Sequence, residues 1–155
     1  MAVTHRVATE TSAAEGVLLD LVNAYEQAFD VAAASVALSA AQACVLGRLS
    51  KHRPMGALAD ELGCDASNIS QIIGRLDGMG LTYREAAPED RRVRLVARTA
   101  KGEELNQRFE RSFSFAREAL ARLSGDEQDL LASLLRKALA SPPAEQGLPD
   151  GGPAD

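Results

Sequence analysis

The spacing of apolar residues between positions 15 and 140 is mostly that of amphipathic helices. Apolar side chains recur at steps of three and four over residues 15–34, which predicts one long helix. The same spacing predicts helices over 39–49, 55–62 and 65–78, and again over 102–122 and 125–139. The predicted fold class is therefore mainly α.

Local signals mark the ends of several of these helices. Ser39 precedes Gln42 and Ser124 precedes Glu127 by three positions, the spacing of a capping box. Gly63 can supply the left-handed conformation that often ends a helix. Two further residues can cap the helices that follow them: Asp65 and Thr99.

Short alternating segments replace the helical spacing over residues 81–85 and 92–98, and a polar stretch over 86–90 separates them. This pattern predicts a β-hairpin. A helix, a glycine-containing turn, a second helix and a basic hairpin together form a winged helix-turn-helix, in which the second helix enters the major groove of DNA. We expect this DNA-binding lobe to span residues 36–101.

The recognition helix predicted over 65–78 has two different faces. Its inward positions are aliphatic, whereas its outward positions are small or polar, as residues that approach bases and phosphates must be. The inward positions are Ile69, Ile72, Ile73 and Leu76. The outward positions are Ala66, Ser67, Asn68, Ser70, Gln71 and Arg75.

The net charge of −5 by itself disfavours binding to nucleic acid, but the charges are unevenly distributed along the chain. Residues 51–101 hold nine Lys and Arg against seven Asp and Glu, so the predicted lobe is positive while the rest is acidic. Arg91, Arg92, Arg94 and Arg98 fall within eight residues of the hairpin. Local charge decides whether a phosphate backbone can be approached, so double-stranded DNA is the expected partner.

Other function classes find little support. No apolar run of 18 residues and no signal-peptide pattern is present, so we expect a cytoplasmic protein without a membrane partner. Two cysteines and two histidines lack metal-ligand spacing, and no phosphate loop, nucleophile elbow or histidine-centred triad occurs. We therefore expect no enzyme activity, metal or cofactor. Residues 1–14 are interpreted as a flexible arm and 141–155 as a disordered tail.

Residues 62–76 and 80–84 resemble the recognition segment of MarR regulators, and residues 88–102 resemble their wing. The similarity extends over about 15–140. The wing signature D-x-R, a strand, then T-x-x-G is matched by Asp90, Arg92, Thr99 and Gly102. The resemblance implies a repressor that binds a palindromic operator as a homodimer and leaves it when a small molecule binds. Gln71, Gly74, Ala97 and Arg98 depart from the usual family residues.

The resemblance also assigns roles. Arg92 would insert in the minor groove, held by Asp90, while Ser67, Asn68, Ser70 and Gln71 face the major groove. Arg75 would contact phosphate, and Arg91 and Arg94 would add charge to the wing. Helices over 15–35 and 102–140 would form the dimer through Leu18, Leu130, Leu131, Leu134 and Leu135.

Small aromatic or phenolic acids are common effectors of the family. Ala43 replaces a bulky apolar residue beside the effector cleft, and His52 or Arg84 could partner a carboxylate. The alternatives are an oxidation sensor of the same fold, or a protein-interaction module that does not bind DNA. For the first, Cys44 is expected to face the core and Cys64 to fill an aliphatic slot, which disfavours reactive thiols.

Overall fold

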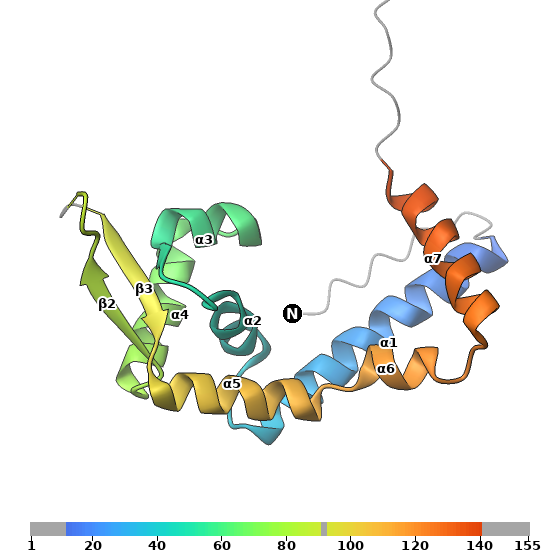
Figure 1. The fold of residues 1–155 in the computed structure, drawn as a ribbon, viewed down its shortest axis with the longest axis horizontal. Coiled ribbons are helices and arrows are strands. Elements are labelled where there is room, and N and C mark those ends of the chain that lie inside the picture. The colour runs from blue at the N-terminus through green and yellow to red at the C-terminus, as the bar shows by residue number, and fades with distance from the viewer. Residues whose placement is uncertain (1–11, 91–92, 141–155) are drawn as a thin grey trace, which may run out of the picture. The chain divides into compact units, whose positions relative to one another are not determined.

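The computed structural model describes residues 12–90 and 93–140, so Arg91 and Arg92 lie outside the described residues. The chain separates into two compact units, residues 1–116 and 117–155. Each unit is considered by itself. The prediction of a mainly helical protein with a small hairpin is confirmed (Figure 1).

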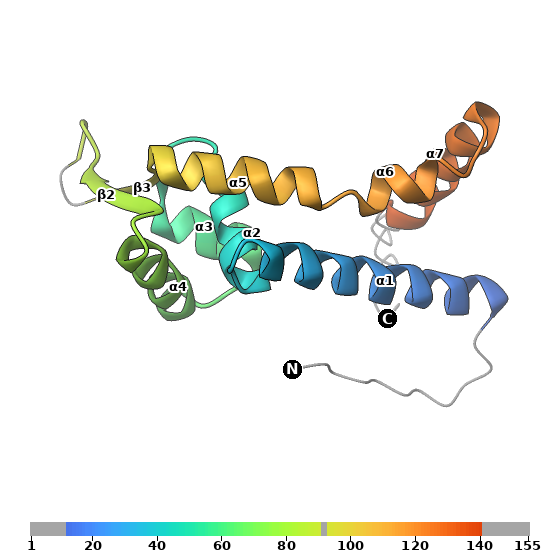
Figure 2. The same cartoon turned by 90° about the horizontal axis from the view of Figure 1, so that it is seen from below.

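The first unit contains most of the regular structure. Its elements in chain order are α1 (Ala13–Ser35), α2 (Ala40–Arg48), β1 (Arg53–Pro54), α3 (Met55–Leu62), α4 (Ala66–Gly78), β2 (Thr82–Ala86), β3 (Arg94–Arg98) and α5 (Ala100–Ser112). The helices α1, α2 and α5 pack against one another, and α2 also packs against α4, which in turn packs against α3 (Figure 2). Aliphatic side chains from all these helices and from the sheet form one buried cluster, and its largest fully buried members are Val45, Leu46, Leu49, Leu58, Ile69, Ile73, Leu76, Leu81 and Val96.

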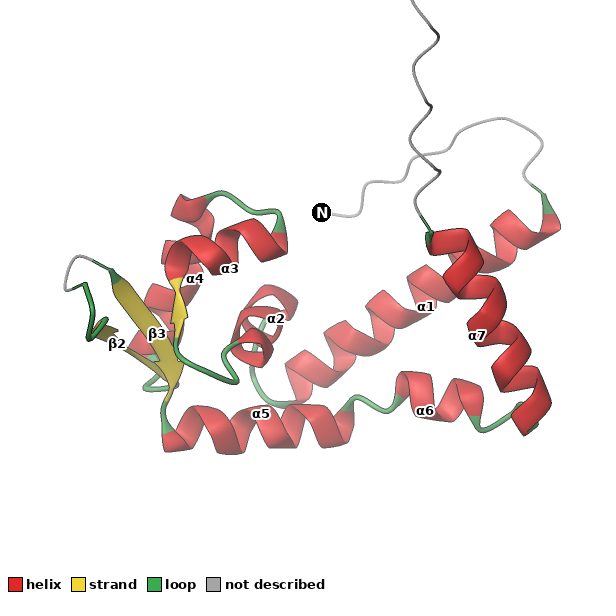
Figure 3. Ribbon diagram, turned by 45° about the horizontal axis from the view of Figure 1, so that its top comes forward, coloured by secondary structure: helices red, strands yellow, loops and turns green. Residues whose placement is uncertain are grey.

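The sheet has three antiparallel strands in the order β1-β3-β2, and Figure 3 shows them beside the helices of the same unit. Residues Thr82 to Ala86 pair with Arg98 to Arg94 in the predicted hairpin. The sequence did not predict β1, whose two residues pair with Val96 and Leu95. A strand of two residues has no periodicity of its own, and only its pairing with β3 makes it a strand.

The helix expected over residues 102–122 is wrong, because two helices occupy this region. α5 ends at Ser112 and α6 (Phe115–Leu120) follows after a break of two residues. At the break the Ser112 hydroxyl donates a hydrogen bond of 2.8 Å to the Phe109 carbonyl, which also accepts from the Phe113 amide at 2.9 Å. Such side-chain bonding to the backbone competes with helix continuation.

The second unit holds the end of α6 and all of α7 (Gly125–Leu139). Both predicted capping boxes are present. Ser39 and Gln42 exchange hydrogen bonds at the start of α2, and Ser124 and Glu127 do so at the start of α7. The Ser124 contacts also lower the pKa of Glu127 below its ordinary value.

Candidate DNA-binding surface

Helix α4 presents a small and polar face because its aliphatic positions are occupied in the core. Its inward isoleucines and Leu76 are 0–8% exposed. Ser70 is half-buried, so it lies at the margin between the two faces. The remaining outward residues that sequence analysis selected are exposed: Ala66, Ser67, Asn68, Gln71 and Arg75.

The turn before α4 sets where that helix begins. Gly63 ends α3 with a left-handed φ of 58°, and the Cys64 amide then donates to the Ala59 carbonyl at 3.0 Å. Asp65 occupies the N-cap position of α4 as expected, but its side chain makes no capping hydrogen bond. The amides of the first turn are therefore not held by this cap, and such amides can bind an anion.

Hydrogen bonds between side chains join α4 to the hairpin that follows it. Asp77, near the end of α4, accepts from the Thr82 hydroxyl and from Nε of Arg84, the latter at 2.8 Å. The Asp77 carboxylate thus ties the end of α4 to the base of the hairpin. Separately, Lys101 Nζ of α5 donates to the backbone carbonyl of Met79, the C-cap residue of α4, at 2.7 Å.

The hairpin tip is mostly exposed where the structure describes it. Arg94 begins β3 and is exposed. The Val93 amide donates to the Asp90 carbonyl at 3.0 Å, and the Ala87 amide donates to the Val93 carbonyl at 2.9 Å, which closes the tip. The predicted pairing of Asp90 with Arg92 falls outside the described residues.

Comparisons with known proteins agree on this arrangement. A family model for a winged helix DNA-binding domain matches residues 38–102. A protein from Bacillus cereus described as a MarR-like transcription regulator is 29% identical, with a TM-score of 0.67 over 81% of this chain and 94% of that one. A cysteine-to-serine variant of Escherichia coli MarR, solved in complex with operator DNA, shares the fold at 22% identity and a TM-score of 0.65. That match covers 81% of this chain and 92% of the MarR chain.

The sequence relatives decide the family. Over 101 residues the chain is 34% identical to the transcriptional regulator HosA of Escherichia coli O111:H-, which covers 57% of this chain and 75% of HosA. The chain belongs to the MarR family. It is a winged helix DNA-binding transcriptional regulator of that type.

The structure explains the second half of the MarR wing signature, Thr99 and Gly102. The Thr99 hydroxyl caps α5 by accepting from the Gly102 amide at 3.0 Å and donates to the Gly80 carbonyl at 2.7 Å. The Thr99 amide donates to the Leu81 carbonyl at 3.0 Å. A Cβ at Gly102 would lie 2.0 Å from that same carbonyl oxygen, so only glycine fits there.

The two polar residues suggested as effector partners are engaged at the base of the wing. His52 Nε2 lies 2.9 Å from the Tyr83 hydroxyl and 3.1 Å from Oε1 of Glu85, both on β2. Arg84 pairs with Asp77 as described above. Ala43 is only 2% exposed within α2. The structure therefore does not bring Ala43, His52 and Arg84 together at one cavity.

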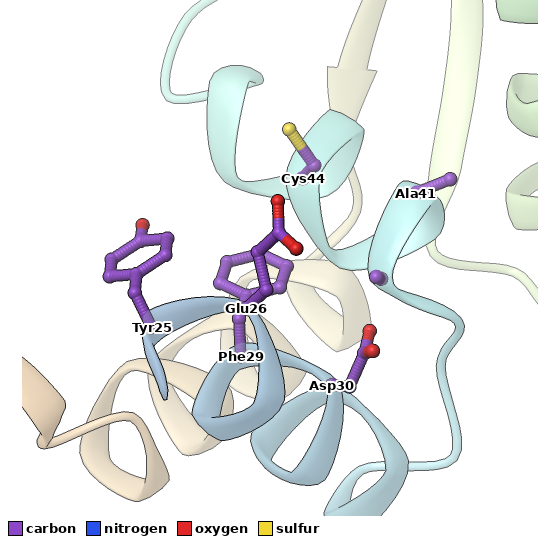
Figure 4. A pocket seen from close by; sticks show the side chains of 7 residues that line it. Tyr25, Glu26, Phe29, Asp30, Ala41 and Cys44 are labelled. Atoms are coloured by element: carbon purple, nitrogen blue, oxygen red, sulfur yellow. The ribbon is translucent and has the colours of Figure 1, made fainter. Parts of the chain in front are cut away.

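A groove of about 510 Å³ lies instead between α1 and α2 (Figure 4). Its walls are aromatic, acidic and small side chains, none of which the sequence suggested as an effector contact. The expectation that Cys44 faces the core is wrong, because this half-buried thiol lines the groove. The lining residues are Tyr25, Glu26, Phe29, Asp30, Ala40, Ala41 and Cys44.

Large apolar side chains are exposed on α1 and α7. The exposed fraction is 49% for Leu18, 59% for Leu130 and 56% for Leu134, whereas Leu131 and Leu135 are half-buried. Val17, Leu21 and Val22 extend the exposed apolar surface of α1. These residues include the five that the sequence assigns to a dimer interface.

No group of three or more potential metal ligands is present among the described residues. No single described helix is long and apolar enough to cross a membrane, while α1 and α2 pass that test of length and composition only as a pair bent by 85°.

Proposed function

We propose that this protein is a ligand-responsive repressor that binds a palindromic operator as a homodimer and is released by a small molecule. The observation that carries the proposal is the two-faced α4. Its aliphatic face is almost wholly buried, while Ser67, Asn68 and Gln71 stand exposed with their hydrogen-bonding groups. A helix of this kind can enter the major groove, where base edges are read by polar side chains.

Specific side chains account for base preference and for register on the duplex. Gln71 and Asn68 can each form bidentate hydrogen bonds with adenine, which favours A·T pairs in the half-site. Arg75 and Arg94 are exposed and can bind phosphate, which positions the lobe without reading sequence. Arg92 is proposed to enter the minor groove, where narrow A·T tracts attract arginine.

The dimer is supported by apolar surface that a single chain leaves exposed. The leucines of α7 stand three and four residues apart on one stripe, and Leu18 extends a second stripe on α1. Contiguous apolar patches of this kind usually mark protein interfaces. Sedimentation at micromolar concentration should find a species of twice the 16.4 kDa chain mass, and a monomer would refute the dimer.

Operator binding is tested with duplexes that the protein itself selects from a random pool. The selected DNA should contain a palindrome whose half-sites lie about one helical turn apart, roughly 34 Å. Arg92→Ala should lower affinity for it by tenfold or more, while Arg91→Ala and Arg94→Ala have smaller effects. The matched control is Arg111→Ala, an exposed arginine on α5 outside the proposed surface.

The minor-groove assignment fails if Arg92→Ala binds like the unchanged protein while a neighbouring substitution abolishes binding. It also fails if Arg92→Ala unfolds the protein, because the side chain would then be structural. The repressor assignment is separate and is read from a reporter gene placed behind the selected operator. Transcription should fall when the protein is present.

A further inference from the structure

The groove between α1 and α2 has a strongly one-sided charge. Glu26 and Asp30 both line it, four residues apart on the same face of α1. Within the described part of the chain neither carboxylate has a salt-bridge partner. Like charges at this spacing repel each other and destabilise a helix slightly, so a cation placed between them would relieve that repulsion.

Basic residues are absent from α1 and from all of α2 but its last residue. No lysine, arginine or histidine occurs over residues 7–47, a stretch that contains all of α1 and nearly all of α2. The groove lining likewise contains no basic side chain. The next residue, Arg48, ends α2 and interacts electrostatically with Tyr25 and Cys44 of the lining, but its guanidinium is paired with Glu61. No basic side chain of the lining itself therefore neutralises Glu26 and Asp30.

Two aromatic rings of α1 line the groove beside these carboxylates (Figure 4). Tyr25 and Phe29 line the groove and lie 6.2 Å apart between ring centroids. Edge contacts with centroid distances of 5.1–5.8 Å join them to rings of α5, of its C-cap residue and of α6, and these contacts restrict their position. Those supporting rings are Phe109, Phe113 and Phe115.

We propose that this groove binds an apolar cation, such as a quaternary ammonium or phosphonium bearing aromatic rings. The ring faces of Tyr25 and Phe29 would attract the cation, and the two carboxylates would neutralise it. An aromatic carboxylate, the effector class that the family resemblance suggests, would instead meet two like charges. The proposal rests on the proposed function only for its regulatory consequence, since the groove adjoins α2, the first helix of the DNA-binding lobe.

Two probes of nearly equal size and opposite charge separate these possibilities. Tetraphenylphosphonium and tetraphenylborate are titrated into the full chain by calorimetry in a sodium buffer. The cation should bind more tightly than the anion. The double variant Glu26→Gln with Asp30→Asn should lose roughly tenfold in affinity for the cation.

The matched control is Glu15→Gln with Asp20→Asn, which removes two exposed carboxylates of α1 outside the groove. This control should retain the affinity of the unchanged protein within about twofold. Thermal unfolding checks that both double variants fold. Because Glu26 and Asp30 are exposed, their neutral replacements leave no buried group unpaired.

Three results would overturn the inference: tighter binding of the anion, unchanged cation affinity in the groove variant, or an equal loss in the control. The last would show that the whole acidic helix attracts cations. Binding to the selected operator duplex, measured on the same protein, distinguishes failure of this inference from failure of the proposed function. A protein that binds operator but not the cation refutes this inference alone, whereas one that binds the cation but no operator refutes the proposed function.

Discussion

Replacing Gly102 by alanine tests whether the close approach at the start of α5 organises the wing. Gly102 is the third residue of α5, and its hypothetical Cβ would lie 2.0 Å from the Leu81 carbonyl oxygen and 2.9 Å from the carbonyl carbon. Real Cβ contacts essentially never fall below 3.0 Å. The substitution therefore forces α5 and residue 81 apart by about 1 Å or more.

The expected cost follows from what that displacement breaks. The Thr99 amide would lose much of its 3.0 Å hydrogen bond to the Leu81 carbonyl, at a cost of about 1 kcal/mol. Leu81 is 1% exposed, so moving it strains the packed core by about 1–3 kcal/mol. Alanine regains about 1 kcal/mol over glycine in a helix. The net loss in free energy of unfolding should be about 2 kcal/mol.

Urea and thermal unfolding at matched protein concentration measure this loss, which corresponds to about 4–8 °C in melting temperature. The control is Gly74→Ala in the middle of α4, where the nearest atom to a new Cβ is a flexible arginine nitrogen at 3.9 Å. That variant should be as stable as the parent or more stable by up to about 1 kcal/mol. If Gly102→Ala is as stable as Gly74→Ala, the reasoning from close approach is wrong.

Three further predictions concern the same lobe. Arg98→Ala should lower the free energy of unfolding by about 1–3 kcal/mol in urea, because this 92% buried side chain donates to the Leu49 carbonyl at 3.0 Å; parent-like stability would contradict this. Arg48 and Arg53 hold the pKa of Glu61 below its ordinary value, so ionised Glu61 adds stability that is lost as the pH falls through its folded-state pKa. In Glu61→Gln the unfolding free energy should therefore decline less steeply below about pH 5. An unchanged dependence of the unfolding free energy on pH would refute this prediction. If the dimer neutralises about six to eight phosphates, log affinity for the operator should fall against log salt with a slope of about −5 to −7, and a slope near zero would exclude phosphate contacts.

Features that depend on nearby residues could be predicted from the sequence. Ser39 and Ser124 sit three positions before a residue that can reach back to their amides, and both capping boxes form. Gly63 ends α3 in the left-handed conformation because only residues close in sequence decide that turn. The two faces of α4 follow from spacing alone.

Features decided by contacts between distant parts of the chain could not be predicted from the sequence. The break after Ser112 is invisible to periodicity, since Phe109, Phe113 and Ala116 keep helical spacing across it. Asp65 has the right residue type for a cap, yet its side chain makes no capping bond. At the break, the local bond from Ser112 to Phe109 is joined by packing of the Phe113 ring against Tyr25 and Phe29 of α1, which periodicity does not encode.

The effector region illustrates the same limit at a functional site. His52 and Arg84 were sensible partners for an anionic ligand, but contacts with β2 and α4 engage them at the wing base. The groove residues Glu26 and Asp30 carried a signal that spacing alone could reveal, namely four-residue separation in a long stretch without basic residues. That signal gains meaning only when α2 closes the groove against them.

The hydrogen bonds between Asp77 and the base of the hairpin affect the entropic cost of binding DNA. Since Thr82 and Arg84 both donate to this carboxylate, the recognition helix and the wing are pre-organised before any duplex arrives. When one docks, the other is then largely oriented, so the proposed contacts in two grooves would share a single loss of translational and rotational freedom. Weakening these hydrogen bonds should make the two sets of contacts independent, each with its own entropic cost.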